Sequence, residues 1–223
     1  MDIYSYEFPQ KKHVSTLAIA LQANGASSYR DACNICRLAN EKWNSSTLIL
    51  CDSLLHINNI PGTTQVILVK SKQELLGEIK RFVKSLIGCD LLFSLSAHGY
   101  RTRHSHNLKY ELNGQSEFVK VNGCPVMDYE LAVALYTEMA PDIHSLCLVD
   151  TCHSGTMLDL EYISTDGEIF NRSRIPDHIR PFSFCISACG DYEMAGEDIS
   201  TYGGWGGKLI SFFLDYVGEK IHV

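Results

Sequence analysis

The sequence lacks the features of a membrane or secreted protein. No apolar run approaches the roughly 18 residues that a membrane-spanning helix needs, and the polar N-terminus, MDIYSYEFPQKKH, does not have the basic-then-apolar layout of a signal peptide. Basic residues are also few, since 19 Lys and Arg stand against 26 Asp and Glu and are scattered along the chain. The footprint of a nucleic-acid-binding protein is therefore missing. We expect a cytoplasmic protein with neither membrane nor nucleic acid as a partner.

The nine cysteines do not suit a disulfide framework, because their number is odd and their spacing irregular. Cys33 and Cys36 form one CxxC pair, and Cys185 and Cys189 are four residues apart. Neither pair has the second pair of ligands that a structural zinc site requires. We expect most of these thiols to be reduced core residues, with no metal site and no required cofactor.

What the sequence does contain is an alternation of strand and helix patterns over its 223 residues. Continuous apolar runs predict strands covered on both faces at 16–21, 47–51, 66–69, 90–96, 145–149 and 182–186. Apolar residues at helical spacing predict helices at 29–43, from a capping box at Ser71 and Glu74 to residue 86, at 129–139 behind Asp128, and at 205–217. This order favours an α/β fold in which a mostly parallel six-stranded sheet has helices on both faces, within a single domain over residues 1–223.

Two long stretches, 99–124 and 154–180, are polar and poor in periodicity. They are expected to be functional or mobile loops rather than domain boundaries.

Two of the expected strands end in residues that can carry nucleophilic chemistry. The segment LLFSLSAHG ends in His98 and Gly99, and SLCLVDTCHSG delivers Cys152 and His153. An imidazole beside a thiol can remove its proton, and a thiolate is a strong nucleophile. The backbone amides of Gly99 and Cys152 are candidates for the oxyanion hole. His153 competes as the base, but a residue next to the nucleophile points away from it, which favours His98.

These segments resemble the metacaspase family of caspase-like cysteine peptidases. SLSAHG is similar to the family's Y-S-G-H-G element, and VDTCHSGTMLDLEY is similar to D-x-C-H-S-G-T-x-L-D-L-P-Y. Fainter similarities follow the family order: YRDACNICRLA to the V-N-D-A-x-N-M region, ISACGDYEMAGED to S-G-C-x-D-D-Q-x-S-A-D, and YGGWGGKLISFFL to the glycine-led closing helix. Caspases have Q-A-C-x-G about the nucleophile, which separates this chain from them.

The resemblance implies a caspase-like (caspase-hemoglobinase) fold, a Cys152/His98 dyad, and an endopeptidase that cleaves proteins or peptides after Arg or Lys. It places Asp31, Ser96, Asp150 and Asp191 in the S1 subsite. Carboxylates suit that role, because charge-assisted hydrogen bonds are strong and an unpaired buried cation is costly.

The family's calcium switch is expected to be weak or absent. Asp159 matches a family ligand, but Asn113, Gln115 and Ser116 stand near where acids are expected, and calcium prefers several carboxylates. The chain also reads as a minimal catalytic unit without a prodomain, acting as a monomer. Arg172, Arg174 and Arg180 are candidate self-cleavage sites, or equally solvated charges of a loop.

Two alternatives stay open. The chain can be a catalytically silent caspase-like scaffold or decoy, although retention of Cys152 and His98 argues against this. It can also be another enzyme on a doubly wound sheet, such as a nucleotide-binding one, but neither G-x-G-x-x-G nor G-x-x-x-x-G-K-[ST] follows the first expected strand.

Overall fold

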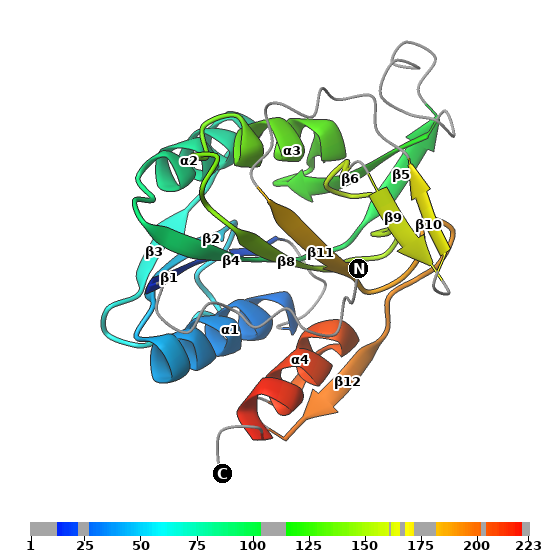
Figure 1. Cartoon of the computed structure of the whole chain (residues 1–223). Helices are drawn as coiled ribbons and strands as arrows, with labels where there is room; N and C mark the ends of the chain where they lie inside the picture. The colour runs from blue at the N-terminus through cyan, green and yellow to red at the C-terminus, as the bar shows by residue number, and fades with distance from the viewer. Residues whose placement is uncertain are drawn as a thin grey trace.

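A six-stranded parallel sheet forms the centre of the computed structural model, which describes residues 13–21, 27–103, 115–160, 162–165, 168–171, 182–201 and 204–219 (Figure 1). Its strands are β1 (His13–Ala20), β2 (Ser46–Cys51), β3 (Gln65–Leu68), β4 (Cys89–Ser96), β8 (Ser145–Asp150) and β11 (Ser183–Ser187). They stand in the order β11-β8-β4-β1-β2-β3, and all five neighbouring pairs are parallel. The six strands expected from the apolar runs are confirmed.

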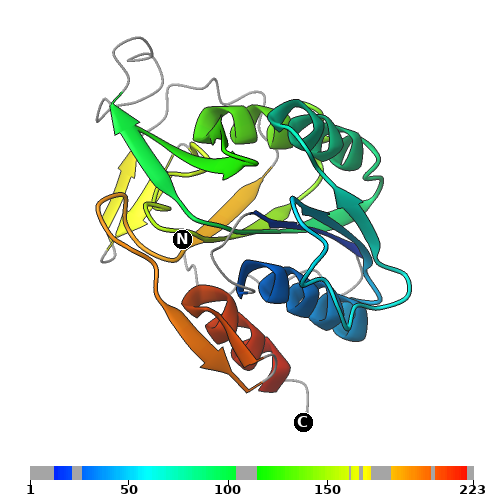
Figure 2. The same ribbon diagram turned by 180° about the vertical axis from the view of Figure 1, so that it is seen from behind.

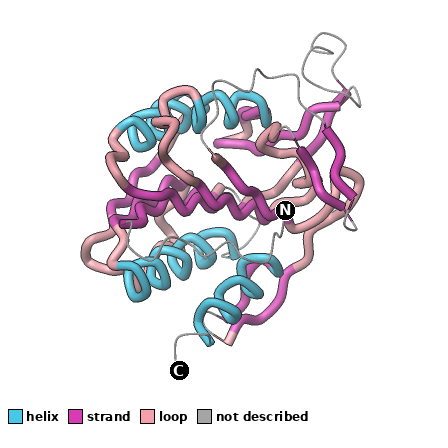
Figure 3. The backbone as a smooth tube through the Cα atoms, viewed as in Figure 1, coloured by secondary structure: helices cyan, strands magenta, loops and turns pink. Residues whose placement is uncertain are grey.

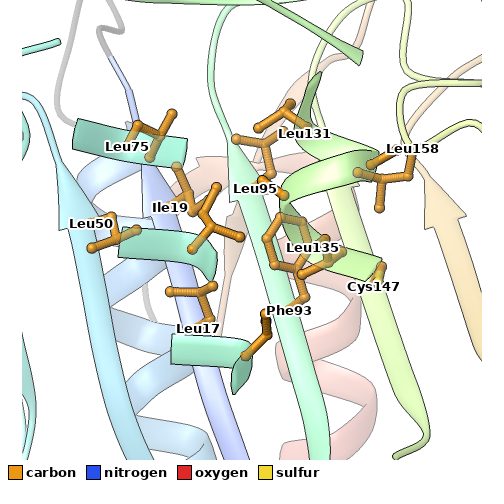
Figure 4. Close-up of a cluster of buried hydrophobic side chains, with 14 of the residues drawn as sticks. Leu17, Ile19, Leu50, Leu75, Phe93, Leu95, Leu131, Leu135, Cys147 and Leu158 are labelled. Carbon is orange, nitrogen blue, oxygen red and sulfur yellow. The ribbon is translucent and has the colours of Figure 1, made fainter. Parts of the chain in front are cut away.

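The runs are continuous because helices cover both faces of the sheet (Figures 1 and 2). Helices α2 (Lys72–Lys84) and α3 (Asp128–Tyr136) lie on one face, and α1 (Ser27–Trp43) and α4 (Lys208–Glu219) lie on the other. Figure 4 shows side chains of β1 and β4, including Ile19 and Phe93, facing Leu75 of α2 and Leu135 of α3. The described part of the chain has no helix of the length and apolar character that a membrane crossing requires.

The ends of the helices agree only in part with the sequence prediction. Ser71 caps α2 as expected, since its Oγ accepts from the Glu74 amide at 3.2 Å. Helix α4 begins at Lys208 rather than at residue 205, because β13 (Gly204–Gly207) pairs with β12 (Glu197–Ser200) in an antiparallel ribbon. Three glycines in those four residues are poor helix formers. Asp128 lies inside the first turn of α3 instead of preceding it.

The two stretches expected to be loops contain strands, which corrects that expectation. The first holds β5 (Tyr100–Arg103), β6 (Gln115–Val121) and the start of β7 (Cys124–Met127), which form a small antiparallel sheet, and the second holds β9 (Tyr162–Thr165) and β10 (Glu168–Asn171). Figure 3 shows these strands apart from the main sheet. In β6 the polar Ser116 and the charged Glu117 are buried alongside Val119 and Val121, so the strand cannot be recognised from hydropathy alone. Arg172, Arg174 and Arg180 lie outside the described residues.

The order of the strands indicates where in the sheet a site is expected. From β1 the chain moves outward through β2 to β3, then returns to β4 on the other side of β1 and continues to β8 and β11. This reversal leaves a switch point between β1 and β4. Ligands of open parallel sheets bind at the carboxyl ends of the strands at such a point. His98 follows the carboxyl end of β4, and α1 follows β1.

Candidate active site

The two predicted catalytic segments leave the sheet side by side. Strands β4 and β8 are neighbours in register, with Ser96 opposite Asp150, and the Ala97 amide continues the ladder by donating to the Asp150 carbonyl at 3.4 Å. His98 and Cys152 each follow two residues after that register pair. The expectation that a thiol and an imidazole leave adjacent strand tips agrees with this register.

Gly99 and the nucleophile turn (Thr151–Ser154) touch through their backbones. A methyl group built on the Gly99 Cα would overlap the carbonyl oxygen of Cys152 and would lie 3.0 Å from the Thr151 Oγ1. Only glycine allows this approach. His98 is exposed and Cys152 is partly buried, so both side chains can be reached from solvent.

Three of the four residues predicted for the S1 subsite lie together behind these tips. The Ser96 hydroxyl donates to Asp31 Oδ2 at 2.7 Å. The Gly207 amide donates to the same carboxylate at 3.1 Å, and the Ile210 amide donates to Asp150 Oδ2 at 2.9 Å. Asp31 and Asp150 are only 1% and 5% exposed. The start of α4 therefore rests on this acid pair, which we define as Asp31 and Asp150.

The closeness of β13 to the acid pair explains two of its glycines, Gly206 and Gly207. A Cβ on Gly206 would overlap Asp31 Oδ1, and one on Gly207 would lie 2.5 Å from the Cγ of Asp150. Asp150 also occupies the N-terminus of α4, where free amides and the helix dipole favour a negative group.

Burial makes both acids hard to ionise. It raises the pKa of Asp31 to about 8, with a further rise from the Asp150 charge, although the Ser96 hydroxyl and the Gly207 amide oppose the shift. Burial likewise raises the pKa of Asp150 to about 6 against the opposing amides of Ile210 and Leu209. At neutral pH the acid pair thus holds about one proton and about one negative charge.

A third carboxylate, Glu197, stands beside the acid pair and was missed by the sequence prediction. Its strand partner across the β12–β13 ribbon is Gly207, the residue that contacts both acids. The Trp205 indole Nε1 donates to Glu197 Oε2 at 2.9 Å. The hydrogen bond from Ser27, then that from Trp205, and also the nearby His98 lower the pKa of Glu197. No periodic or capping pattern marks this exposed residue, so only the pairing of β12 with β13 reveals it.

Asp191 contacts the nucleophile turn and the two residues after it. Its Oδ1 accepts from the Thr156 hydroxyl at 3.0 Å, and its carbonyl lies 2.8 Å from Nδ1 of His153. The backbone of Asp191 packs against Gly155, where a Cβ would lie 3.0 Å from the Asp191 amide nitrogen. The structure therefore places Asp191 beside the turn that follows Cys152.

Of the four residues considered for calcium, the structure describes Asp159, Gln115 and Ser116. Asp159 is buried and has a left-handed backbone conformation, with a φ of 47°. Gln115 and Ser116 lie on β6. Asn113 lies outside the described residues. Nearby, Asp128 accepts from the amides of Glu117 and Tyr129 at 2.9 and 2.7 Å. Over the described ranges, no group of three or more His, Cys, Asp or Glu residues is arranged to hold a metal ion. Weak or absent calcium dependence remains a prediction.

Comparison with known proteins supports the fold alone. Models of known protein families give no match to the sequence, and curated protein sequences give none either. Among solved structures, the chain is similar to protein GSU0716 from Geobacter sulfurreducens, with 18% sequence identity and a TM-score of 0.60 over 94% of this chain and 83% of that one. At so low an identity the likeness concerns the α/β architecture, and any function must be argued from the site itself.

Proposed function

We propose that this chain is a cysteine endopeptidase of the metacaspase kind, with a caspase-like fold, that cleaves proteins after Arg or Lys. The observation that carries the proposal is the backbone contact between Gly99 and Cys152 at the ends of neighbouring strands. It brings the tip that bears the proposed base and the tip that bears the proposed nucleophile together on β4 and β8, next to the switch point between β1 and β4. The resemblance of SLSAHG and DTCHSG to the metacaspase elements supports the same assignment.

In the proposed mechanism, His98 takes the proton from the Cys152 thiol, and the thiolate attacks the scissile carbonyl carbon. The new C–S bond converts the carbonyl to an oxyanion, which the amides of Gly99 and Cys152 stabilise. Protonated His98 gives its proton to the leaving amine as the C–N bond breaks, which leaves a thioester on Cys152. Water, activated by His98, then hydrolyses the thioester and restores the thiol.

The acid pair supports a preference for a basic P1 side chain. It holds about one negative charge at neutral pH, which matches one Arg or Lys cation. Because Asp31 and Asp150 are buried, a P1 side chain must carry its charge at the end of a long apolar stem, as Arg and Lys do. Glu197 adds a fully ionised carboxylate beside Gly207 and favours the same charge.

The experiment is a peptide series with a fluorogenic leaving group and Arg, Lys, Gln or Asp at P1. We expect turnover of the Arg and Lys peptides only, and loss of that turnover in Cys152→Ala. The matched control is Cys124→Ala, which removes an exposed thiol on β7 and should leave turnover unchanged. Equal turnover in wild type and Cys152→Ala would contradict the assignment. No turnover of any peptide by the folded wild type would favour the silent scaffold.

A further inference from the structure

The segment after β11 folds into a tight turn that packs against the nucleophile turn. We define it as the 189–193 turn. The Gly190 amide donates to Glu193 Oε2 at 2.8 Å and the Glu193 amide donates to the Gly190 carbonyl at 3.1 Å, so the turn is closed on itself by its own last residue. The Cys189 amide also donates to Ser154 Oγ at 3.3 Å. These hydrogen bonds fix the conformation of the 189–193 turn and its position relative to Ser154.

His153 rests on this turn through two hydrogen bonds. Its amide donates to the Glu193 carbonyl at 3.0 Å, and its ring Nδ1 lies 2.8 Å from the Asp191 carbonyl. A carbonyl only accepts, so Nδ1 must carry the proton and donate. His153 has a left-handed φ of 56°, which few residues other than Gly adopt and which His, Asn and Asp tolerate best. The two bonds hold the residue after the nucleophile in a conformation that it would otherwise rarely populate.

The same carbonyl is also tied to the segment that carries the base. Arg101 stands two residues after Gly99, and its Nη1 donates to the Asp191 carbonyl at 3.4 Å. Its guanidinium lies 4.6 Å from the centre of the Tyr192 ring, a cation–π contact with the same turn. One backbone carbonyl thus receives donors from both catalytic segments and fixes one relative to the other.

We propose that His153 is a positioning residue, whose Nδ1–H bond to the Asp191 carbonyl aligns Cys152 with His98. The inference rests on the proposed function, because it assigns a role within that same site. His153 acts through the backbone of its neighbour and does not itself exchange a proton with substrate. A misplacement of about 1 Å in a reacting group costs up to about 100-fold in rate. The expected effect of losing the bond is therefore a fall in kcat of about 10- to 100-fold, with KM changed by less than about twofold.

The test compares His153→Asn with His153→Asp and His153→Ala. The side-chain nitrogen of Asn lies where Nδ1 of His lies, and both Asn and Asp accept a left-handed φ, so the two variants differ in the donor at that position. We expect His153→Asn to keep kcat within about threefold of wild type. His153→Asp and His153→Ala should lose about 10- to 100-fold in kcat with KM little changed. Equal losses in Asn and Asp, or wild-type kcat in Ala, would overturn the proposal.

A second measurement does not depend on turnover. The rate of Cys152 alkylation by iodoacetamide at pH 7, followed by peptide mass spectrometry, reports the reactivity of the nucleophile directly. We expect wild type and His153→Asn to react at similar rates, and the Asp and Ala variants to react more slowly. If the wild type cleaves no peptide, the proposed function fails while this comparison still decides the role of His153. Equal alkylation rates in all four proteins would overturn it.

Discussion

The Cα of Gly99 lies against the carbonyl group of Cys152, so that no side chain fits between the two strand tips. This contact joins two segments that are more than fifty residues apart in the sequence. It sets the distance between the end of β4, which is followed by the proposed base His98, and the turn that contains the proposed nucleophile Cys152.

Gly99→Ala should abolish most peptidase activity, because the added methyl group overlaps the Cys152 carbonyl and must push the two tips apart. We expect a fall of at least about 100-fold in kcat/KM and a lower thermal midpoint. The matched control is Gly77→Ala, in the middle of α2, where an added methyl group meets nothing within 4 Å. That control should raise stability by about 0.5–1 kcal/mol, since Ala is the better helix former. A fully active Gly99→Ala enzyme would contradict the proposed geometry.

The stability of the protein should fall as the pH rises from about 5 to about 8. The pKa of Asp31 is raised to about 8 in the folded chain, so the folded state keeps a proton that the unfolded state has already released. Where the folded state binds more protons, the free energy of unfolding decreases with pH. Urea unfolding of wild type and Asp31→Asn across this range measures the effect. The variant, which has no proton to lose at residue 31, should show a shallower pH dependence, and identical slopes would show that Asp31 does not titrate in this range.

Glu197→Gln should weaken selection for a basic P1 residue. The change removes an ionised carboxylate and leaves an amide oxygen that can still accept from Trp205 Nε1. We expect kcat/KM to fall about 3- to 10-fold for an Arg peptide, an effect of about 1 kcal/mol that is typical of a partly screened charge. A Gln peptide should show no such fall. Glu78→Gln on α2, where the carboxylate pairs with Arg81, provides the same change of net charge and should leave both values unchanged.

Two glycines of β13 should differ in their tolerance of Ala. Gly204 has a φ of 77° but nothing within 4 Å of its added methyl group, so Gly204→Ala should cost only the backbone strain, about 1–2 kcal/mol. In Gly207→Ala the methyl group meets the buried Asp150 carboxylate, which accepts from the Ile210 amide and has little room to move. We expect a larger loss of stability and detachment of the first turn of α4. Urea unfolding measures the free energy of unfolding of both variants. An equal loss of stability in the two would contradict the packing around Gly207.

The main sheet could be predicted from the sequence because its physical signal is local. Strands such as β4 are buried on both faces, so nearly every residue is apolar and the run is unbroken. The small antiparallel sheet of β5, β6 and β7 has no such signal in its sequence. Glu117 lies in the middle of β6 and is buried, and its Oε2 lies 3.0 Å from the hydroxyl oxygen of Thr156, thirty-nine residues further on. A partner so distant cannot be inferred from a window of neighbouring residues.

The same distinction applies to the candidate site. His98 and Cys152 end apolar strands, so their position at the carboxyl edge of the sheet follows from the pattern around them. Asp31 lies on α1 and looks like a surface acid from its neighbours alone, and only its similarity to a metacaspase element suggested a role. In the fold its carboxylate accepts hydrogen bonds from Ser96, which is 65 residues away, and from Gly207, which is 176 residues away. The roles of Glu197 and of the 189–193 turn depend on pairings of this kind and are visible only in the folded chain.

The contact between the start of α4 and the acid pair also sets the order in which the site can form during synthesis. His98 and Cys152 leave the ribosome before the segment that covers Asp31 and Asp150, because the amides that bind these acids belong to Gly207 and Ile210. At translation rates of about 5–20 residues per second, the nascent chain spends several seconds with both catalytic residues made and the acid pair still open to water. During that interval the proposed nucleophile is present, but the proposed S1 subsite is incomplete. An unfinished chain would therefore lack the proposed selection for a basic P1 residue.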